Sequence, residues 1–327
     1  MRRLALALAV LTLAACDTST DAGPDVVYVG NRGAGVSGGT ITRLSADGPD
    51  LPSDVGGRVE SVVQLGRRLY VLVDAPDAGH LDVFDLDTGV RVRQSAVPAP
   101  RRMAVVAGVG YVSNAGTYSV TPVTLATGQA GPPVQVGDQP VGVAAVGNRV
   151  FVATWNGGVG TDVRVVSALT RTVVQTIEVG CAGPRDLVAD GDGDVWAVCT
   201  GGGAAGQVVV IDGASGQVVA RFSLDRPVPS LGQTAAFSAR HDELFVSDGA
   251  AVLHFDTRAN APAGRIEASG VSAVAYDDRA DRLLLGRPDP AAPDTAPGVV
   301  TVHDRSGTET ARVPAGVLPV AIAPRPE

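Results

Sequence analysis

A short strand pattern recurs seven times along this chain, and that repeat restricts the possible fold more than any other feature. Each copy centres on an apolar run that contains one aromatic residue or a leucine. The seven anchor residues are Tyr28, Tyr70, Tyr111, Phe151, Trp196, Phe245 and Leu284. Successive anchors lie 42, 41, 40, 45, 49 and 39 residues apart. Self-similarity at such a period is typical of repeat architectures.

Every unit has the same internal order of segments. A strand of small residues, such as 142–145, comes first, and a tight turn such as Gly147-Asn148 follows it. The anchor strand, a Gly-rich loop and a third strand come next, and a second turn leads into a fourth strand. Asp, Asn and Gly at the turns supply hairpin geometry. Four antiparallel strands in about 40 residues are typical of one blade of a β-propeller.

The sequence therefore predicts an all-β, seven-bladed propeller with four-stranded antiparallel blades. No window has a convincing helical period. An open or eight-bladed array would need a further repeat, and we find none. The predicted blades are 24–57 with 317–323, 59–97, 100–136, 139–179, 183–224, 232–268 and 270–315.

The two ends of the repeat region complete each other. The first unit begins at its anchor strand and lacks the small-residue strand before it. The segment 317–323, close to the C-terminus, is a small-residue strand without a unit of its own. We expect this segment to pair with residues 25–31, which would close the ring and leave no open sheet edge.

The first sixteen residues have the features of a targeting signal. Arg2 and Arg3 precede an apolar segment, 4–13, that is too short to span a bilayer as a mature helix. The tetrapeptide that ends at Cys16, Leu-Ala-Ala-Cys, resembles the lipobox of bacterial lipoproteins. In that family the bond before the Cys is cut and the Cys is acylated. An ordinary cleaved secretory signal and a buried N-terminal helix are the alternatives.

The lipobox resemblance sets the expected domain organisation and location. Residues 1–15 would be a signal peptide, 16–24 a lipidated tether, and 25–327 a single propeller domain. The mature protein would lie in the bacterial cell envelope, periplasmic or surface-exposed, with the membrane as a partner through lipid on Cys16. Because acylation adds more than one chain, the anchor would be stable.

Charge and motif content exclude several classes of function. The net charge of −8 argues against a nucleic-acid-binding surface. The four histidines have no metal-ligand spacing, and the chain has no nucleophile elbow, phosphate-binding loop or dinucleotide fingerprint. No catalytic residue, metal or cofactor is therefore assigned, and a monomer is expected. The Asp-Gly-Asp-Gly-Asp run 190–194 invites a calcium site, but it also fits a simple hairpin turn.

The anchor strands and turns resemble those of the YVTN/YncE-like propeller family. The segments that carry the resemblance are 27–31 (Val-Tyr-Val-Gly-Asn), 111–114 (Tyr-Val-Ser-Asn) and 85–89 (Asp-Leu-Asp-Thr-Gly). Members of that family serve as binding modules and cell-surface proteins, and some lipid-anchored relatives capture cobalamin for an outer-membrane transporter. The motifs mark strands and turns and do not assign chemistry.

The longest and most Gly-rich loops of a propeller like this one gather on one face, where the innermost strands begin. We expect a ligand there, because loops carry function more often than scaffold strands. Trp155 would stack on a ligand or fold back over a neighbouring blade. Arg101, Arg185 and Arg287 would form a cationic rim or pair with nearby Asp residues. The candidate residues on this face are Asn31, Arg32, Arg101, Asn114, Tyr118, Trp155, Asn156, Arg185 and Arg287, with Arg102 and Gln233 in the entry loops.

Two cysteines remain in the globular part. Cys181 precedes an innermost strand and Cys199 ends the adjacent anchor strand, so a disulfide is expected outside the cytoplasm. Two buried thiols or a redox pair are the alternatives.

The leading functional hypothesis is a lipid-anchored recognition module that uses one propeller face for a small molecule or an envelope protein, for example as an accessory to an uptake system. A lactonase- or hydrolase-like enzyme would need acids such as Asp74, Asp248 and Asp289 to converge at the channel mouth. A protein-interaction scaffold would need no small-molecule site.

Overall fold

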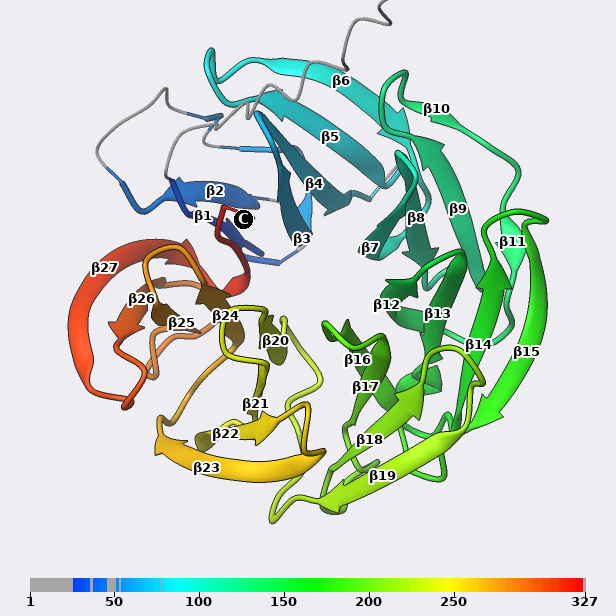
Figure 1. The fold of residues 1–327 in the computed structure, drawn as a ribbon. Helices are drawn as coiled ribbons and strands as arrows, with labels where there is room; N and C mark the ends of the chain where they lie inside the picture. The colour runs from blue at the N-terminus through cyan, green and yellow to red at the C-terminus, as the bar shows by residue number, and fades with distance from the viewer. Residues whose placement is uncertain (1–25, 36–37, 46–50, 53, 77, 326–327) are drawn as a thin grey trace, which may run out of the picture.

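Seven β-sheets stand side by side around a central axis and form a closed ring (Figure 1). This computed structural model describes residues 26–35, 38–45, 51–52, 54–76 and 78–325. The predicted signal peptide, Cys16 and the tether lie outside the described residues. The seven-bladed, all-β prediction is confirmed, and a 3-10 turn, η1 (Asn156–Gly158), is the only helical element among the described residues.

Blades are numbered here along the chain from the sheet that contains β1, and strands run outward from the axis. Blade 2 consists of β3 (Arg58–Leu65), β4 (Arg68–Asp74), β5 (His80–Asp85) and β6 (Arg91–Ala96). Blade 3 consists of β7 (Pro100–Val106), β8 (Val109–Asn114), β9 (Ser119–Thr124) and, sharing the outer position, β10 (Gln129–Ala130) and β11 (Val134–Gln135). Blade 4 consists of β12 (Pro140–Val146), β13 (Arg149–Thr154), β14 (Asp162–Ser167) and β15 (Thr172–Glu178).

The remaining blades follow the same antiparallel order. Blade 5 consists of β16 (Pro184–Ala189), β17 (Asp194–Cys199), β18 (Gln207–Asp212) and β19 (Val218–Ser223). Blade 6 consists of β20 (Ala235–Ser238), β21 (Glu243–Ser247), β22 (Ala251–Asp256) and β23 (Ala261–Glu267). Blade 7 consists of β24 (Ala273–Asp277), β25 (Arg282–Arg287), β26 (Pro297–His303) and β27 (Glu309–Val317).

Blade 1 joins the two ends of the chain, as the sequence predicted. Its innermost strand is β28 (Pro319–Ala323), which pairs antiparallel with β1 (Tyr28–Asn31), and β2 (Thr40–Arg43) pairs with the other side of β1. The register places Tyr28 opposite Ala323 and Val29 opposite Ile322. Within the described residues this sheet has three strands, whereas each of the other sheets fills four positions from the axis outward.

The apolar core lies between adjacent blades rather than inside one central cluster. Trp196 of β17, for example, is fully buried against Phe255 of blade 6, with ring centroids 5.9 Å apart. Each blade presents alternate side chains of its strands to the blade before it and the blade after it. Aliphatic residues fill most of these interfaces, and the anchors Tyr28, Tyr111, Phe151 and Phe245 are buried among them.

Bulges interrupt five innermost strands near the point where they begin. Register shifts occur at the start of β3, β7, β12 and β16, and opposite β28 in its pairing with β1. Four of these strands start with Pro, at positions 100, 140, 184 and 319, which suits a strand start because Pro has no N–H to donate. A bulge re-aims neighbouring side chains. It occurs here where Glu60, Arg102 and Arg185 lie.

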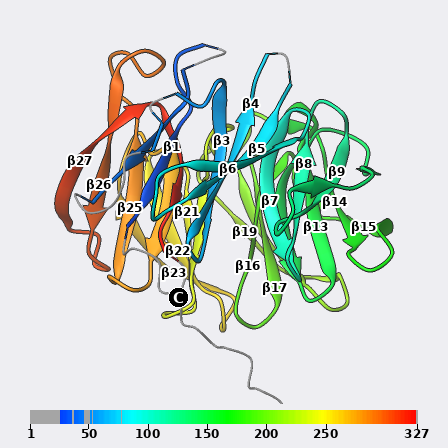
Figure 2. The ribbon, with the colours of Figure 1, turned by 90° about the horizontal axis from the view of Figure 1, so that it is seen from above.

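The ring has two distinct faces, seen edge-on in Figure 2. We call the side where the innermost strands begin the entry face, and the opposite side, where β28 ends, the exit face. Among the described residues, no helix has the length and apolar character needed to cross a membrane.

Candidate functional site

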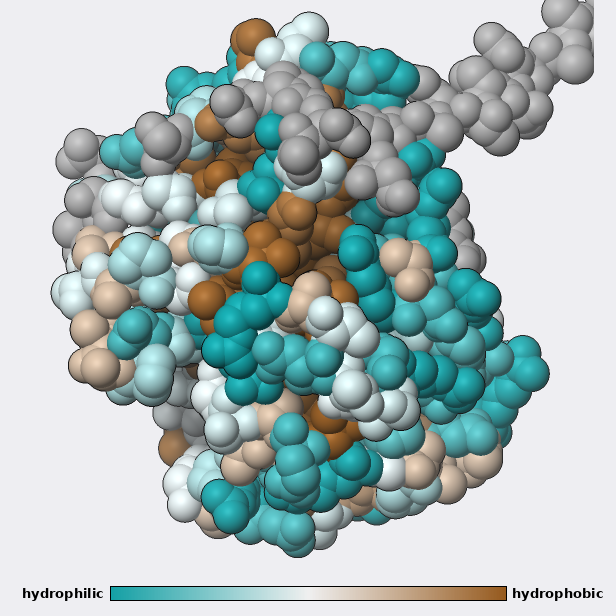
Figure 3. All heavy atoms as spheres, turned by 90° about the vertical axis from the view of Figure 1, so that its left-hand side faces the viewer, coloured by the Kyte–Doolittle hydropathy of each residue, from teal (hydrophilic) through white to brown (hydrophobic). Residues whose placement is uncertain are grey.

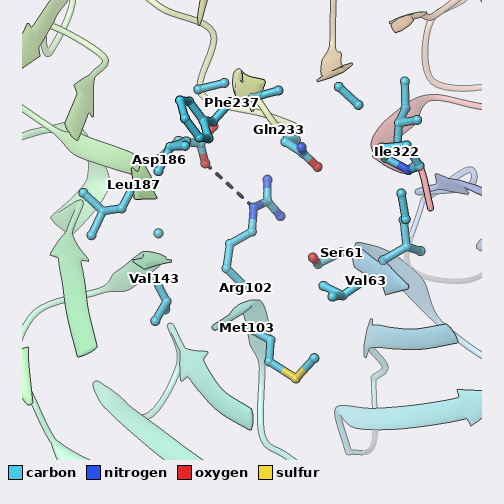
Figure 4. Close-up of a pocket in the computed structure, with 18 of the residues that line it drawn as sticks. Ser61, Val63, Arg102, Met103, Val143, Asp186, Leu187, Gln233, Phe237 and Ile322 are labelled. Carbon is cyan, nitrogen blue, oxygen red and sulfur yellow. Dashed lines mark ion pairs between the residues drawn. The ribbon is translucent and has the colours of Figure 1, made fainter. Parts of the chain in front are cut away.

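A cavity of about 330 Å³ lies on the axis of the ring. Its lining comes from the innermost strands of all seven blades, from their middle and later residues in most blades, and from Pro324 just after β28, so the cavity extends toward the exit face. Figure 4 shows the apolar walls and the polar side chains of Ser61, Arg102, Asp186 and Gln233, of which Arg102 and Gln233 point into the space. The labelled wall residues are Val63, Met103, Val143, Leu187, Phe237 and Ile322.

A short segment of the β19–β20 connection, 232–234, crosses the axis at the entry side of this cavity. The carbonyl oxygen of Gly232 accepts hydrogen bonds from Arg102 at 2.6 Å and from Arg185 at 2.7 Å. The backbone of Gln233 donates to the carbonyl of Val320 in blade 1 and accepts from the N–H of Val274 in blade 7. The segment therefore contacts four other blades and forms the floor of the cavity.

Charged side chains near this floor form two ion-paired sets, which a hydrogen bond from Arg102 to the backbone carbonyl of Glu60 links; together we call them the axial charge cluster. Glu60 pairs with Arg32 and Arg101, each at 3.3 Å, and Asp74 pairs with Arg101 at 2.9 Å and with Arg58 at 2.6 Å. Nearer the axis, Asp186 lies 3.4 Å from Arg185 and 3.7 Å from Arg102. The cluster thus comprises Arg32, Arg58, Glu60, Asp74, Arg101, Arg102, Arg185 and Asp186.

Burial and charge shift the pKa values of the two innermost ionic groups. Burial lowers the pKa of the Arg185 guanidinium to about 10, against the opposing effect of Asp186. Burial acts to raise the pKa of Asp186, but the charges of Arg185 and Arg102 and the hydrogen bonds from Thr234 outweigh it, so that pKa is lowered. Both groups are therefore charged at neutral pH, and the Asp186 carboxylate faces Arg185, Arg102 and Thr234.

Arg102 has donors left over for a ligand. Its guanidinium is hydrogen-bonded to backbone carbonyls of Glu60, Arg101 and Gly232, and its Nε faces Asp186 at 3.7 Å, beyond hydrogen-bonding distance. A guanidinium carries five N–H donors, so not all of them are used by these bonds. The side-chain amide of Gln233 makes no hydrogen bond to another described residue. Both groups lie at the apolar cavity, where unpaired donors are costly.

The nine predicted ligand-binding residues do not line this cavity, although Arg185 donates to its floor. None of Asn31, Arg32, Arg101, Asn114, Tyr118, Trp155, Asn156, Arg185 and Arg287 lines it, whereas Arg102 and Gln233 do. Arg32, Arg101 and Arg185 are brought together in the axial charge cluster and are paired with carboxylates, which was the alternative to a cationic rim. Asp186 was missed. Its position within an apolar strand gave no sign that a bulge turns it toward the axis.

The motif asparagines are buried between strands. The Asn31 amide donates to Thr42 Oγ1 at 2.9 Å and to Thr40 Oγ1 at 3.1 Å. The Asn114 amide donates in the same way to Ser119 and Thr121 of the next strand. Both side chains are fully inaccessible to solvent. In this structure they therefore link the second and third strands of a blade.

The other predicted loop residues do not converge. Trp155 is half-buried beside η1, and its indole nitrogen is buried without a hydrogen-bond partner among the described residues. Tyr118 and Asn156 are exposed and have positive φ angles of 55° and 43°. Arg287 is on blade 7, and burial lowers the pKa of its guanidinium. Trp155 and Asn156 lie side by side on blade 4, whereas Tyr118 is on blade 3 and Arg287 is on blade 7.

Cys181 and Cys199 are joined by a disulfide, with Cα atoms 6.1 Å apart. Both residues are buried in the interface between blades 4 and 5. The bond ties the connection before β16 to the end of β17, next to the glycines at 201–203.

The carboxylates considered for catalysis or calcium are engaged in local structure. Asp74 is paired with arginines, while Asp248 and Asp289 accept backbone N–H groups in their own turns. Asp190 accepts the backbone N–H groups of Asp192 and Asp194 and the indole N–H of Trp196. Across the described part of the chain, no three His, Cys, Asp or Glu side chains are grouped as metal ligands.

Comparison with known proteins supports the fold and no more. No protein-family model matches the chain. No curated protein sequence matches it either. Among solved structures it is similar to Kuenenia stuttgartiensis hydrazine synthase, with a TM-score of 0.69 and 20% sequence identity over 85% of this chain and 91% of that chain. Identity this low shows a shared propeller fold, and fold does not fix function.

Proposed function

We propose that this chain is a lipid-anchored binding protein of the bacterial cell envelope that holds a small molecule in its axial cavity. The observation that carries the proposal is the cavity itself, an apolar space into which Arg102 and Gln233 project polar groups (Figure 4). Apolar walls with a few convergent polar groups are typical of small-molecule sites, which range from about 300 to 1,000 Å³. The site differs from the entry-face loops favoured by the sequence.

The location rests on the N-terminal sequence. The basic residues, the short apolar segment and the lipobox at Cys16 support export and acylation. The Cys181–Cys199 disulfide is consistent with an oxidising compartment. The YncE-like strand motifs fit a binding role, and assistance to an uptake system is one such role.

A Cys16→Ser variant tests the anchor. Expressed in a bacterial host, the wild type should enter the membrane fraction and carry acyl chains by mass spectrometry. The variant should be released in soluble form. A wild-type protein that is recovered without acylation would disprove this part of the proposal.

A fragment screen by ligand-observed NMR tests the cavity. Neutral, cationic and anionic fragments are compared on the wild type and on Val63→Phe, which fills the cavity from one wall. Val92→Phe, an exposed position on β6, controls for added bulk. We expect a set of fragments to lose binding only with Val63→Phe. The proposal fails if no fragment of any charge responds to Val63→Phe.

A protein-interaction scaffold is the second candidate, and one feature favours it. A furrow of about 600 Å³ lies between blade 7 and the three-stranded blade 1, lined in part by Val27, Leu44 and Val302. Figure 3 looks at this side of the molecule, the side of β27 and β2 in Figure 1, and shows apolar residues at the bottom of a hollow. Binding partners that are lost with Leu44→Glu but kept with Val63→Phe would favour the scaffold.

A further inference from the structure

The charge balance around the axial cavity differs from that of the rest of the protein. The axial charge cluster holds five guanidinium groups, from Arg32, Arg58, Arg101, Arg102 and Arg185, and three carboxylates, from Glu60, Asp74 and Asp186. It therefore carries an excess of two positive charges, whereas the whole chain has a net charge of −8. Because the protein interior has a lower dielectric constant than water, the electrostatic potential of this excess positive charge is stronger there than it would be in solvent.

Asp186 lines the cavity together with Arg102, but neighbouring groups engage its carboxylate oxygens. The carboxylate of Asp186 faces Arg185 and Thr234 with one oxygen and Arg102 with the other. Arg102 is the cluster arginine that lines the cavity, and its guanidinium reaches the middle of the ring, between Asp186, Gln233 and Ser61 (Figure 4). A ligand in the cavity would thus meet the unused donors of Arg102, the neutral amide of Gln233 and the Asp186 carboxylate, which is already paired.

The rest of the cavity sets the size and polarity of what can fill it. Its volume of about 330 Å³ lies near the lower end of the range of about 300 to 1,000 Å³ that is typical of small-molecule sites. Its walls beyond the floor are mostly aliphatic and aromatic side chains such as Val143, Leu187 and Phe237, with Ser61 and Gln64 on one side. A compact ligand with an apolar body suits these walls.

From these three features we infer that the cavity binds a small carboxylate with an apolar body, its carboxylate directed at Arg102 and Gln233. This inference rests on the proposed small-molecule function and adds the chemical class of the ligand. A planar carboxylate accepts two N–H donors of a guanidinium at once, and such charge-assisted bonds are the strong ones. The amide of Gln233 would donate a further bond to the same group.

Isothermal titration calorimetry with three matched probes tests the class of ligand. The probes are 3-phenylpropionate, 3-phenylpropionamide and 3-phenylpropylamine, which share one apolar body and differ in charge. We expect the carboxylate to bind at least about tenfold more tightly than the amide, and the amine to bind most weakly. Val63→Phe should abolish binding of the carboxylate, which places it in the cavity.

Substitution of single arginines tests whether Arg102 is the residue that binds the carboxylate of the ligand. Arg102→Gln should weaken binding of 3-phenylpropionate by about tenfold or more, so that this carboxylate no longer binds more tightly than the amide probe. Arg93→Gln is the matched control, because Arg93 also donates to a carbonyl of a neighbouring blade, Leu125 at 2.9 Å, but does not line the cavity. It should leave the preference intact. If Arg102→Gln does not fold, the ranking of the probes and Val63→Phe still decide.

Two results would overturn the inference and each bears differently on the proposed function. Equal affinity for amide and carboxylate, both lost in Val63→Phe, would refute the carboxylate class and leave a binding cavity. Failure of all three probes would also refute the class, and the wider fragment screen would then decide whether the cavity binds anything.

Discussion

The side-chain oxygen Oδ1 of Asn31 accepts a hydrogen bond from the backbone N–H of Gly316 at 3.0 Å, across 285 residues of sequence. Asn31 ends β1 and Gly316 lies near the end of β27, so this bond ties blade 1 to blade 7 where the ring closes. The amide of the same side chain donates to Thr40 and Thr42. One buried residue thus links strands of one blade and also supports the closure.

Asn31→Ala should destabilise the fold more than Asn114→Ala. Asn114 occupies the matching place in blade 3 and donates to two hydroxyls, but its Oδ1 has no hydrogen-bond partner among the described residues. Each lost buried hydrogen bond costs about 1 kcal/mol or more. Urea unfolding should give the Asn31 variant a free energy of unfolding lower by about 1 kcal/mol than that of the Asn114 variant. Equal losses would contradict a role in closure.

Removal of the disulfide should lower stability without changing the fold. Cys181 and Cys199 are 18 residues apart. In the chain-entropy account, a disulfide that closes a loop of this size raises the free energy of unfolding by about 3 kcal/mol. The Cys181→Ala/Cys199→Ala double variant should lose about that amount in urea unfolding under oxidising conditions. Wild type treated with reductant serves as the control and should unfold at a similar urea concentration. A wild type that is indifferent to reductant would argue against the bond.

Asp190 should stabilise blade 5 through hydrogen bonds. Its Oδ2 accepts the indole N–H of buried Trp196 at 2.8 Å, and Oδ1 accepts the backbone N–H of Asp194 at 2.8 Å. Asp190→Ala leaves both donors unpaired, so a loss of about 1–3 kcal/mol is expected. In a Trp155→Phe background, the emission of Trp196 reports the change directly. Added calcium should not raise the melting temperature of the wild type, and a clear rise would revive the metal hypothesis.

The fold was largely readable from the sequence because its signals are local and repeated. Each anchor strand, such as the one around Tyr111, combines an apolar run with a turn of Asp, Asn or Gly, and seven copies reinforce one another. Closure was predictable as well, because 317–323 had no other strand with which to pair. The sequence predicted four strands for blade 1 as for the others, and the described residues of that blade form three.

The site was harder to predict for a physical reason. The sequence placed Arg102 and Gln233 in the entry loops of the predicted ligand face, but it does not show that the segment 232–234 crosses the axis. That crossing depends on Gly232 and on contacts with Val274 and Val320, which come from distant blades. The bulge before Asp186 also cannot be read from an alternating pattern, since a one-residue insertion changes which face a side chain takes.

The charge on Asp186 should make stability depend on pH in the acid range. The pKa of its carboxylate is lowered in the folded state, through Arg185, Arg102 and Thr234 in spite of burial. Its contribution is therefore fully present above the unfolded value of about 4, and it is lost as the pH falls through the lower folded value. Urea unfolding measured from pH 7 to pH 3 should show this decline.

Asp186→Asn separates the pH effect from the general loss of a buried charge. The variant leaves Arg185 without its partner, so we expect a free energy of unfolding about 3–5 kcal/mol lower at pH 7. Its decline between pH 5 and pH 3 should be shallower than that of the wild type, because one depressed carboxylate is missing. An unchanged slope would show that other carboxylates, such as Asp74, account for the acid sensitivity.

Gly232→Ala should be the most disruptive small substitution at the floor of the cavity. Gly232 has a φ of +82°, which L-residues rarely adopt, and an added Cβ would lie 1.8 Å from the carbonyl oxygen of Ser272. Backbone strain and the steric clash together should cost about 3 kcal/mol or more. Gly270→Ala is the control, because Gly270 has a similar φ of +69° but open space around the added atom.

The pair of glycine variants distinguishes the conformation of one residue from the position of the whole floor. Gly270→Ala should lose about 1–2 kcal/mol, the conformational part alone. Gly232→Ala must also shift the carbonyl that accepts from Arg102 and Arg185, so binding of 3-phenylpropionate should weaken along with stability. Calorimetry well below the melting temperature measures the two effects separately. If Gly232→Ala loses stability but binds the probe as the wild type does, the floor does not position Arg102 for its ligand.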